Sequence, residues 1–152
     1  MQPNTEMAVD GDRYASSTEE SLDPSAINDR SPRVCLVDDD RSVLKAMSRL
    51  IVSAGWEVES FNDPNAFLNH AEKEPPPLVV LDILMPLMNG LEVQRRLKEI
   101  SPSTRVIILT SKDDPFVRNR AMEAGATAFF VKPVNDEDFL AEIESAVSPD
   151  GE

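Results

Sequence analysis

The chain of 152 residues has a single cysteine, one tryptophan, one tyrosine and one histidine. Since one thiol cannot form an internal disulfide, Cys35 is expected to be a buried structural residue within the apolar run 34–37. No apolar stretch approaches the ~20 residues that a membrane-spanning helix needs, so no membrane association is expected. The N-terminus also lacks a basic region followed by an apolar block, which predicts a cytoplasmic location.

Basic residues are scarce as well: 15 Lys and Arg stand against 28 Asp and Glu, and the formal charge is −13. A surface with this charge repels nucleic acid backbones and anionic membranes. Direct DNA binding is therefore not expected, and partners recognised through protein contacts are favoured. The length and the 41% share of hydrophobic residues suit one well-packed domain.

Residues 1–32 differ from the remainder of the chain. Their large apolar residues show no periodicity, and acids outnumber bases by seven to two. Such a segment buries too little surface to offset its ordering entropy, which predicts a disordered acidic tail. The folded domain is predicted to span residues 33–147, followed by a C-terminal tail at 148–152. With so short a tail, no DNA-binding domain is expected at that end.

Short apolar runs alternate with amphipathic segments from Arg33 onward. Continuous apolar runs indicate strands buried on both faces of a parallel sheet, and they occur at 34–37, 78–81, 106–109 and 129–131. The segment 56–61 instead alternates between apolar and polar residues, which is typical of a strand at an exposed edge.

Five helices are predicted between these strands from their start and stop signals. They begin near Arg41, at Asp63-Pro64, after Asn89-Gly90, at Asp114-Pro115 and at Asn135, and the first and fourth end at Gly55 and Gly125. Five βα units predict an α/β fold. We expect a doubly wound, five-stranded parallel sheet of order 2-1-3-4-5, flavodoxin-like, because this order places the alternating strand at an edge.

Polar residues follow or end four of the five predicted strands: Asp38 and Asp39, Asp82, Thr110, and Lys132. The carboxyl ends of parallel strands meet at one edge of the sheet, where ligand sites form at the topological switch point. Three converging carboxylates repel one another unless a cation lies among them, and a hard divalent ion such as Mg²⁺ suits oxygen ligands. Together these residues predict a phosphoryl-transfer site. Taken singly, each of these residues could instead have a structural role. The run 38–40, for example, could cap the first helix, and Asp40 is the expected cap.

Four motifs resemble the receiver domain of bacterial two-component response regulators: VDDD (37–40), LDILMPLMNG (81–90), ILTS (108–111) and AMEAGATAFFVKP (121–133). The resemblance covers essentially the whole predicted domain, and the length fits a single-domain regulator. It implies that Asp82 is the phosphoacceptor. It also implies that Asp39, Asp82 and the backbone carbonyl of Leu84 bind Mg²⁺ directly, while Asp38 acts largely through water.

The resemblance further implies roles for residues at the ends of the last strands. Lys132 would contact the phosphoryl group, and its bond to Pro133 would be cis. Thr110 would move to hydrogen-bond the phosphoryl group. Phe129 fits the aromatic switch position of the family, although plain core packing explains this residue equally well.

The sequence contains neither a Gly-rich phosphate loop nor a second histidine beside His70, which is expected at the surface. The phosphoryl group would therefore come from a sensor histidine kinase or a phosphotransfer protein. Phosphorylation would change the face formed by the last two helices and the last strand, and so switch the binding of a downstream target protein. The domain would assist its own Mg²⁺-dependent phosphorylation and dephosphorylation without being an enzyme in the usual sense.

The first helix is the expected kinase-docking face, since it has more apolar residues than one buried stripe requires: Val43, Leu44, Met47, Leu50 and Ile51. The alternative is that all five belong to the core. By resemblance, Leu84 and Lys112 flank the path of an attacking water, and neither is suited to activate it, which predicts slow autodephosphorylation.

Two other functions fit parts of the pattern. A pseudo-receiver would be an interaction module that is never phosphorylated, although the acidic residues, Thr110 and Lys132 speak against it. A phosphatase with an aspartyl-phosphate intermediate shares the chemistry, but such enzymes commonly have a second Asp where Leu84 stands here.

Overall fold

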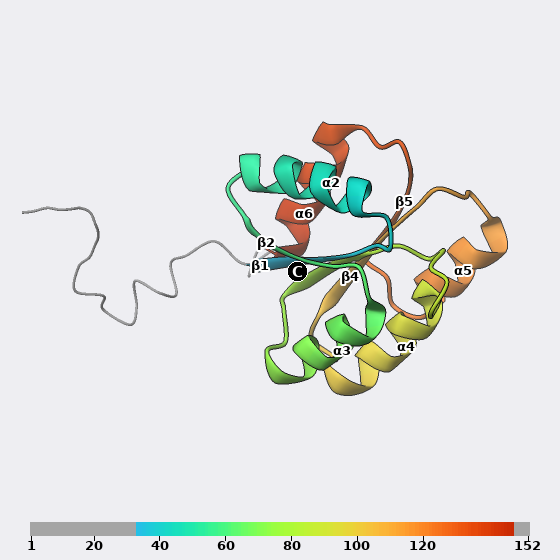
Figure 1. The fold of residues 1–152 in the computed structure, drawn as a ribbon. Helices are drawn as coiled ribbons and strands as arrows, with labels where there is room; N and C mark the ends of the chain where they lie inside the picture. Colours follow the sequence, from blue (N-terminus) through green and yellow to red (C-terminus); the bar gives the residue numbers. More distant parts are fainter. Residues whose placement is uncertain (1–32, 148–152) are drawn as a thin grey trace, which may run out of the picture. The chain divides into compact units, whose positions relative to one another are not determined.

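The computed structural model describes residues 33–147, so the predicted tails at 1–32 and 148–152 lie outside the described part of the chain. Strands and helices alternate along it (Figure 1): β1 (Arg33–Val37), α2 (Arg41–Ser53), β2 (Glu57–Phe61), α3 (Pro64–Lys73), β3 (Leu78–Leu81), α4 (Gly90–Ile100), β4 (Arg105–Thr110), α5 (Pro115–Glu123), β5 (Ala128–Val131) and α6 (Asp136–Val147). Among the described helices, none is long and apolar enough to cross a membrane.

The five strands form one parallel sheet in the order β2-β1-β3-β4-β5, which confirms the predicted topology. β1 lies between β2 and β3, with Val34 opposite Val58 on one side and opposite Leu78 on the other. β2 is an edge strand, as its alternating sequence predicted, and its side chains are mostly half-buried. The strand order reverses beside β1, so the switch point lies between β1 and β3.

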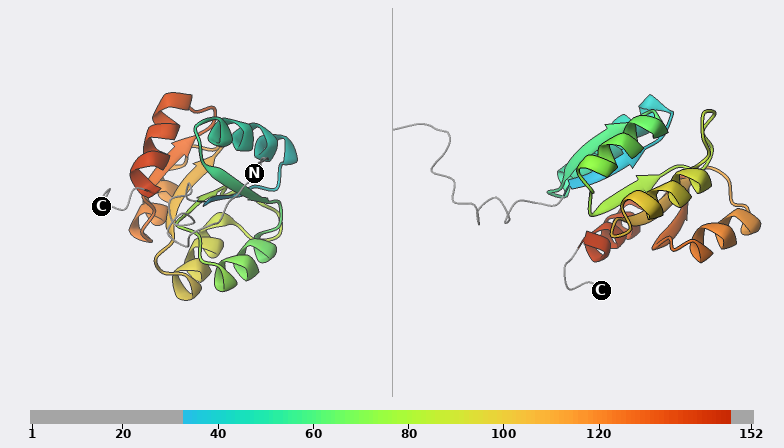
Figure 2. Two further views of the ribbon diagram at one scale, coloured as in Figure 1. Left: turned by 90° about the vertical axis from the view of Figure 1, so that its left-hand side faces the viewer. Right: turned by 90° about the horizontal axis from the view of Figure 1, so that it is seen from below.

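Helices cover both faces of the sheet (Figures 1 and 2). Successive strand residues point to opposite faces: Val34 and Leu36 pack with α2 and α6, whereas Cys35 and Val37 pack with α3, α4 and α5. This two-sided burial explains the continuous apolar runs of the inner strands. Cys35 is fully buried and free, as expected of a structural thiol.

The helix starts follow the capping signals of the sequence. Asp40 accepts hydrogen bonds from the backbone N–H groups of Ser42 and Val43, and Asp63 and Asp114 cap α3 and α5 in the same way. Each of these two later helices has proline at its first position, where no intrahelical N–H bond is lost. The caps fix the points where the chain leaves β1 and β4, and therefore position the loops at the carboxyl edge.

The five apolar residues of α2 that were singled out as a possible docking face are buried or half-buried, which favours the alternative that they belong to the core, and docking on this helix stays a prediction. Leu44 and Ile51 are buried, and Met47 and Leu50 are half-buried against the cluster beneath α2 and α6. Val43 is also half-buried. The helix lies over both β1 and β2, and its inner residues share a core cluster with residues of α6.

Candidate functional site

The carboxyl edge of the sheet brings the predicted residues together because each follows or ends a neighbouring strand. The backbone N–H of Asp82 donates to the carbonyl of Val37 at 3.0 Å, and that of Asp38 donates to Phe61 at 3.1 Å. These bonds continue the backbone hydrogen-bonding pattern of the sheet by one residue beyond the ends of β3 and β1. Asp38 and Asp82 therefore lie side by side at the ends of two adjacent strands.

Asp38, Asp39 and Asp82 form an acidic cluster in which each residue offers one carboxylate oxygen, and these oxygens lie within 4.8 Å of one another. Asp38 and Asp82 are 5% and 6% exposed, whereas Asp39 is exposed to solvent. Two carboxylates of the cluster are thus buried and the third faces solvent, an arrangement suited to a cation that enters from solvent.

The protonation of Asp82 reflects this crowding. Burial, followed by the negative charge of Asp38, raises the pKa of the Asp82 carboxyl to about 6, against the opposing effects of Lys132 and of backbone N–H groups that include that of Leu84. The Leu84 N–H donates to Asp82 Oδ1 at 3.4 Å. One lysine therefore does not offset the desolvation and repulsion at Asp82, and a further positive charge would favour its ionised form.

Lys132 binds Asp38 in this structure. Its Nζ donates to Asp38 Oδ2 at 2.9 Å, and the other carboxylate oxygen of Asp38 accepts the backbone N–H of Asp40, also at 2.9 Å. Both oxygens of Asp38 are thus hydrogen-bonded, while Asp82 accepts only from backbone N–H groups among the described residues. The peptide bond between Lys132 and Pro133 is cis, as the resemblance implied.

Thr110 ends β4 beside this cluster and is only 1% exposed. Its hydroxyl has no hydrogen-bond partner within residues 33–147. Buried hydroxyl groups are usually paired. The Thr110 hydroxyl is therefore a hydrogen-bond donor without an acceptor at the carboxyl edge of the sheet, within the described residues.

Phe129 is half-buried in β5, opposite Ile108 of β4, and packs on the face covered by α3, α4 and α5. The guanidinium of Arg118 lies 4.7 Å from the centroid of its ring and also pairs with Asp113 at 3.1 Å. Nothing in the sequence pattern indicated that Arg118 covers this ring, because the contact joins a helix to a strand that follows it.

The sequence predicted only that a helix follows Asn89-Gly90, yet Gly90 packs against the loop that follows Asp82. A Cβ atom at this position would lie 2.8 Å from the Cα of Ile83 and closer still to the carbonyl oxygen of Asp82. The Gly90 N–H donates to the Ile83 carbonyl at 2.8 Å. The absence of a side chain therefore lets α4 begin directly against the backbone that carries Asp82.

His70 was expected at the surface, but it is half-buried on α3. Its ring lies 5.3 Å from that of Phe61, and its Nε2 is 3.6 Å from Glu59. A histidine near the end of a helix gave no sign of this packing, since β2 and α3 are brought together only by the fold.

The same edge of the sheet thus carries a buried aspartate, two further acids, a lysine and an unpaired hydroxyl, in the order and spacing of the motifs. Residues 34–144 match the family described as the response regulator receiver domain. The chain belongs to this family. The receiver domain accounts for nearly all of the described residues.

Individual relatives agree with this assignment. The chain is 37% identical over 121 residues to the response regulator protein TodT of Pseudomonas putida, covering 80% of this chain and 53% of that protein. Among solved structures, a response regulator receiver protein from Burkholderia phymatum is 39% identical with a TM-score of 0.68, covering 77% of this chain and 95% of that one. The BeF3-activated DrrB receiver domain is 34% identical with a TM-score of 0.70, covering 77% and 97%.

The chain spans about half the length of the curated relatives it matches, such as TodT. The comparisons therefore give no support to the prediction that direct DNA binding is absent. They show a phosphoacceptor domain of two-component signalling, of a kind that interacts with histidine kinases. The roles of the individual site residues stay predictions.

Proposed function

We propose that this receiver domain accepts a phosphoryl group on Asp82 from the phosphohistidine of a sensor kinase or phosphotransfer protein. The phosphorylated form would then change its binding to a downstream target protein. The observation that carries the proposal is the placement of a buried carboxylate, Asp82, among two other acids, with Lys132 and Thr110 at the same edge.

The proposed reaction is a single group transfer. A carboxylate oxygen of Asp82 attacks the phosphorus, the P–N bond to the donor histidine breaks, and its electron pair stays on the imidazole nitrogen. The product is an acyl phosphate. Transfer of this kind depends mainly on positioning and charge neutralisation. Lys132, which is hydrogen-bonded to Asp38, would supply one positive charge to the incoming phosphoryl oxygens.

The acidic cluster fits Mg²⁺. Its three carboxylates converge within 4.8 Å, and burial together with the charge of Asp38 raises the pKa of Asp82 to about 6, so a bound cation would favour its ionised form. We expect Asp39, Asp82 and the backbone carbonyl of Leu84 to hold the ion directly, with Asp38 acting through water. When bound, the ion would neutralise charge on the phosphoryl oxygens.

Thr110 and Phe129 would couple phosphorylation of Asp82 to a conformational change at the surface of the domain. The unpaired Thr110 hydroxyl is a ready donor for a phosphoryl oxygen on Asp82. Its movement would open space beside Phe129, which would leave the Arg118 guanidinium and turn inward. The affected surface comprises α5, β5 and α6, and we expect it to bind the target. The change is a population shift between two arrangements.

Replacing Asp39 with alanine is expected to weaken Mg²⁺ binding by about tenfold or more, because a direct ligand is lost. Asp39 is exposed, so the fold should be retained. The measurement is a Mg²⁺ titration followed by calorimetry. Asp40→Asn is the matched control, since it alters a neighbouring acid but keeps an N-cap side chain. Equal Mg²⁺ affinity in Asp39→Ala and wild type would show that the ligand set is wrong.

Replacing Leu84 with asparagine is expected to speed the loss of the phosphoryl group. Leu84 lies two residues after the phosphoacceptor, is 49% exposed and is unable to hydrogen-bond an attacking water. A positioned amide would accelerate hydrolysis by about tenfold, equivalent to ~1.4 kcal/mol of barrier. The measurement is the decay of purified phosphoprotein in excess Mg²⁺. Leu87→Asn, on the same loop and 71% exposed, is the control; equal decay of all three proteins would refute the role of Leu84.

Incubation of the full chain with acetyl phosphate, with and without Mg²⁺, tests the proposed function against its two alternatives. We expect one phosphoryl group per chain, taken up only when Mg²⁺ is present. A pseudo-receiver would stay unlabelled under both conditions. A phosphatase would instead turn over a phosphoester such as p-nitrophenyl phosphate continuously, without accumulating phosphoprotein.

A further inference from the structure

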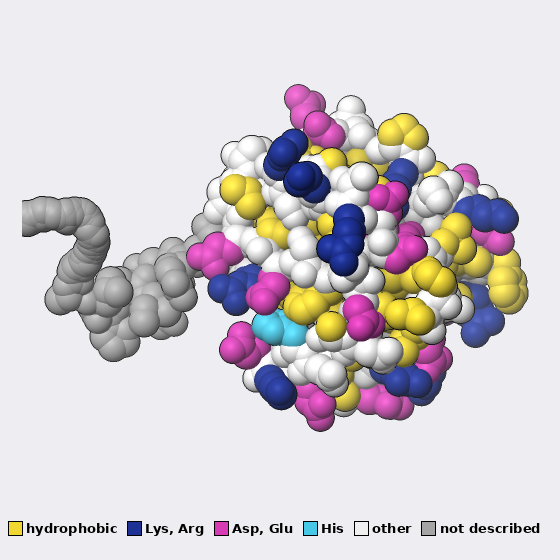
Figure 3. Space-filling model, in the orientation of Figure 1, with side chains coloured by type: hydrophobic (Ala, Val, Ile, Leu, Met, Phe, Trp, Pro, Cys, Tyr) yellow, Lys and Arg dark blue, Asp and Glu magenta, His cyan; other side chains and the backbone are white. Residues whose placement is uncertain are grey.

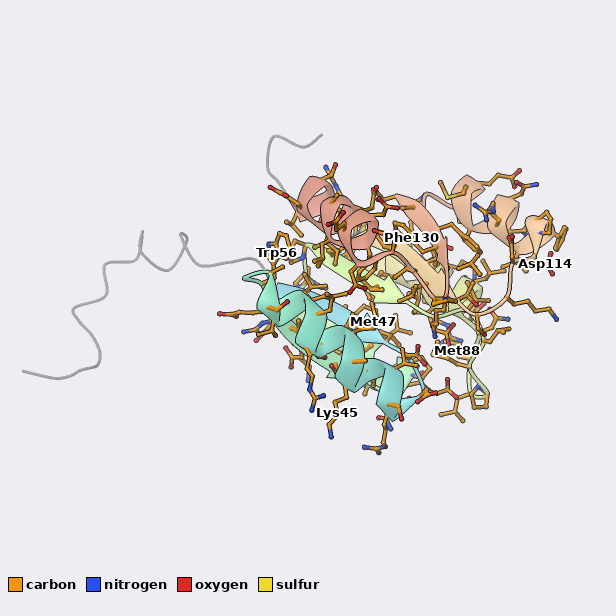
Figure 4. The ribbon with its side chains drawn as sticks, turned by 90° about the horizontal axis from the view of Figure 1, so that it is seen from above. Lys45, Met47, Trp56, Met88, Asp114 and Phe130 are labelled. Atoms are coloured by element: carbon orange, nitrogen blue, oxygen red, sulfur yellow. The ribbon has the colours of Figure 1, made fainter. Side chains whose placement is uncertain are left out.

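The short helix α5 has few contacts that hold it to the rest of the domain. Ala121 is its only buried residue, Val117 is half-buried, and Phe116 in its first turn is 66% exposed. Figure 3 shows hydrophobic and basic side chains at the surface over α5, and Figure 4 shows Asp114, which caps its N-terminal end, at the periphery of the domain. A contact that fixes Ala121, in the last turn, therefore has a large share in fixing the helix.

A side chain of the neighbouring helix α4 makes such a contact. Gln94 is 3% exposed, and its Nε2 donates to the backbone carbonyl of Ala121 at 3.0 Å. The carbonyl groups in the last turn of a helix lack intrahelical N–H partners, and that of Ala121 also accepts the N–H of Ala126 at 3.0 Å. Only the NH2 group of an amide can donate to a carbonyl oxygen, so the orientation of the Gln94 amide is defined. The bond thus joins α4 to α5 at one point and in one direction.

The stability of the fold gives no clear reason for glutamine at this position. The Oε1 atom of Gln94 has no hydrogen-bond partner among the described residues. A buried polar atom without a partner costs at least about as much free energy as a typical hydrogen bond contributes. A methionine would fill a similar volume without this cost, and the Ala121 carbonyl would keep its bond from Ala126. What a methionine would lose is the fixed direction of the contact between the two helices.

The first turns of α4 lie against the proposed phosphorylation site. Gly90 begins the helix so close to the backbone of Asp82 that an added Cβ atom would overlap it. Gln94 follows one turn later, about 6 Å along the helix axis. A displacement of the backbone that carries Asp82 would therefore shift the start of α4 and, with it, the amide of Gln94.

On α5, the bond is made one turn after Arg118, whose guanidinium lies 4.7 Å from the centroid of the Phe129 ring. A helix that is held at Ala121 keeps Arg118 over this ring. A helix that turns about Ala121 would instead carry Arg118 away from the ring and displace Phe116 still further, while its last turn stays in place.

We propose that Gln94 is a positioning residue, which pins the last turn of α5 to α4 so that α5 pivots about Ala121 when Asp82 is phosphorylated. The first turn of α5, with Phe116 at the surface, moves most and the last turn moves least. Gln94 acts through α5 and takes no part in the phosphoryl transfer itself. This inference rests on the proposed function, because it concerns how a phosphoryl group on Asp82 changes the surface that includes α5.

The test compares the full chain with its Gln94→Met variant, in metal-free buffer and with Mg²⁺ and beryllofluoride, a mimic of the phosphoryl group. Backbone amide NMR signals and residual dipolar couplings give the orientation of α5 relative to α4 in each state. Thr104→Val is the matched control. The Thr104 hydroxyl is also buried and donates to the backbone carbonyl of Pro76 at 2.6 Å, but it lies just before β4, at the edge of the sheet opposite Asp82. Melting curves and labelling by acetyl phosphate are measured for all three proteins.

In wild type, we expect beryllofluoride to change the angle between α5 and α4, with larger shifts of the amide signals at 116–119 than at 120–123. The side-chain NH2 signals of Gln94 should stay protected from solvent exchange in both states. In Gln94→Met, the amides of 120–123 should exchange at least about fivefold faster than in wild type, and the shifts should spread evenly over α5. Labelling of this variant by acetyl phosphate should stay within about twofold of wild type. Thr104→Val should melt lower than wild type, yet its α5 should respond as in wild type.

A wild-type α5 that keeps its orientation, or whose last turn moves as far as its first, would overturn the pivot. This comparison needs no variant, so it decides the matter even if Gln94→Met melts too low to be measured. An α5 response in Gln94→Met that equals that of wild type would overturn the positioning role, as would the same altered response in Thr104→Val. If wild type neither takes a phosphoryl group from acetyl phosphate nor binds beryllofluoride, the proposed function itself fails.

Discussion

Replacing Asp82 with asparagine is expected to abolish phosphoryl uptake from every donor, because the amide keeps the shape of the side chain but is a poor nucleophile. The measurement compares phosphoprotein formed from acetyl phosphate in wild type and variant, with Mg²⁺ present. We expect a loss of at least about a hundredfold, since both oxygens of Asp38 are hydrogen-bonded and Asp39 is exposed to solvent. Equal labelling of the two proteins would refute Asp82 as the acceptor.

The same variant has an expected effect on stability that depends on pH. Asp82 has a folded-state pKa of about 6, above its usual value, so its ionisation opposes folding. Its contribution to stability is greatest below the pKa of the unfolded chain and is lost as pH rises through about 6. In metal-free buffer at about pH 7.5, Asp82→Asn should therefore be more stable than wild type, by about 3 kcal/mol at most.

This advantage of the variant should disappear at about pH 4 and should shrink when Mg²⁺ is added at neutral pH, because the ion stabilises ionised Asp82 only in wild type. Melting curves at both pH values, with and without Mg²⁺, provide the measurement. A variant that melts well below wild type in metal-free neutral buffer would show that Asp82 is stabilised rather than strained by its surroundings.

Replacing Gly90 with alanine is expected to disturb both the fold and phosphorylation. The added Cβ would overlap the backbone of Asp82 and Ile83, so α4 and the phosphoacceptor loop must separate. Overpacking of this kind costs about 1–3 kcal/mol, which corresponds to a fall of several degrees in melting temperature. We also expect slower labelling by acetyl phosphate, because the backbone that carries Asp82 is displaced.

Gly55→Ala is the matched control for this prediction. Gly55 has φ of 103° and no atom within 4 Å of an added Cβ, so alanine there strains the backbone without touching the site. Its cost is about 1 kcal/mol, with an unchanged labelling rate. If Gly90→Ala labels as fast as Gly55→Ala, the close approach of α4 to Asp82 has no part in the reaction.

The place of β2 at one edge was predictable from its strand pattern, whereas β5, predicted from its continuous apolar run to be buried on both faces, is the other edge strand and only half-buried. The run 78–81 is continuously apolar and lies at the centre, whereas 56–61 alternates and lies at the edge. The convergence of Asp38 and Asp82 follows from that order, since both side chains come directly after adjacent parallel strands. Local capping signals, such as Asp40 before α2, placed the helix starts equally well.

Contacts between distant elements were not predictable in the same way. Periodicity shows which residues of α2 share a side, but it does not fix how much of the helix the sheet covers, so it left open whether Met47 and Leu50 belong to the core, against which the structure packs them. The close approach of Gly90 to Asp82 likewise depends on two separate loops.

Peptide mapping of the full chain after reaction with acetyl phosphate and Mg²⁺ tests phosphoryl transfer to Asp82 most directly. Borohydride reduces an acyl phosphate to an alcohol, so a phosphorylated aspartate becomes homoserine and is located by tandem mass spectrometry. The predicted result is homoserine at position 82 alone, and none when Mg²⁺ is omitted. Homoserine at Asp38 or Asp39 instead, or at no position, would contradict the assignment of Asp82 as the phosphoacceptor.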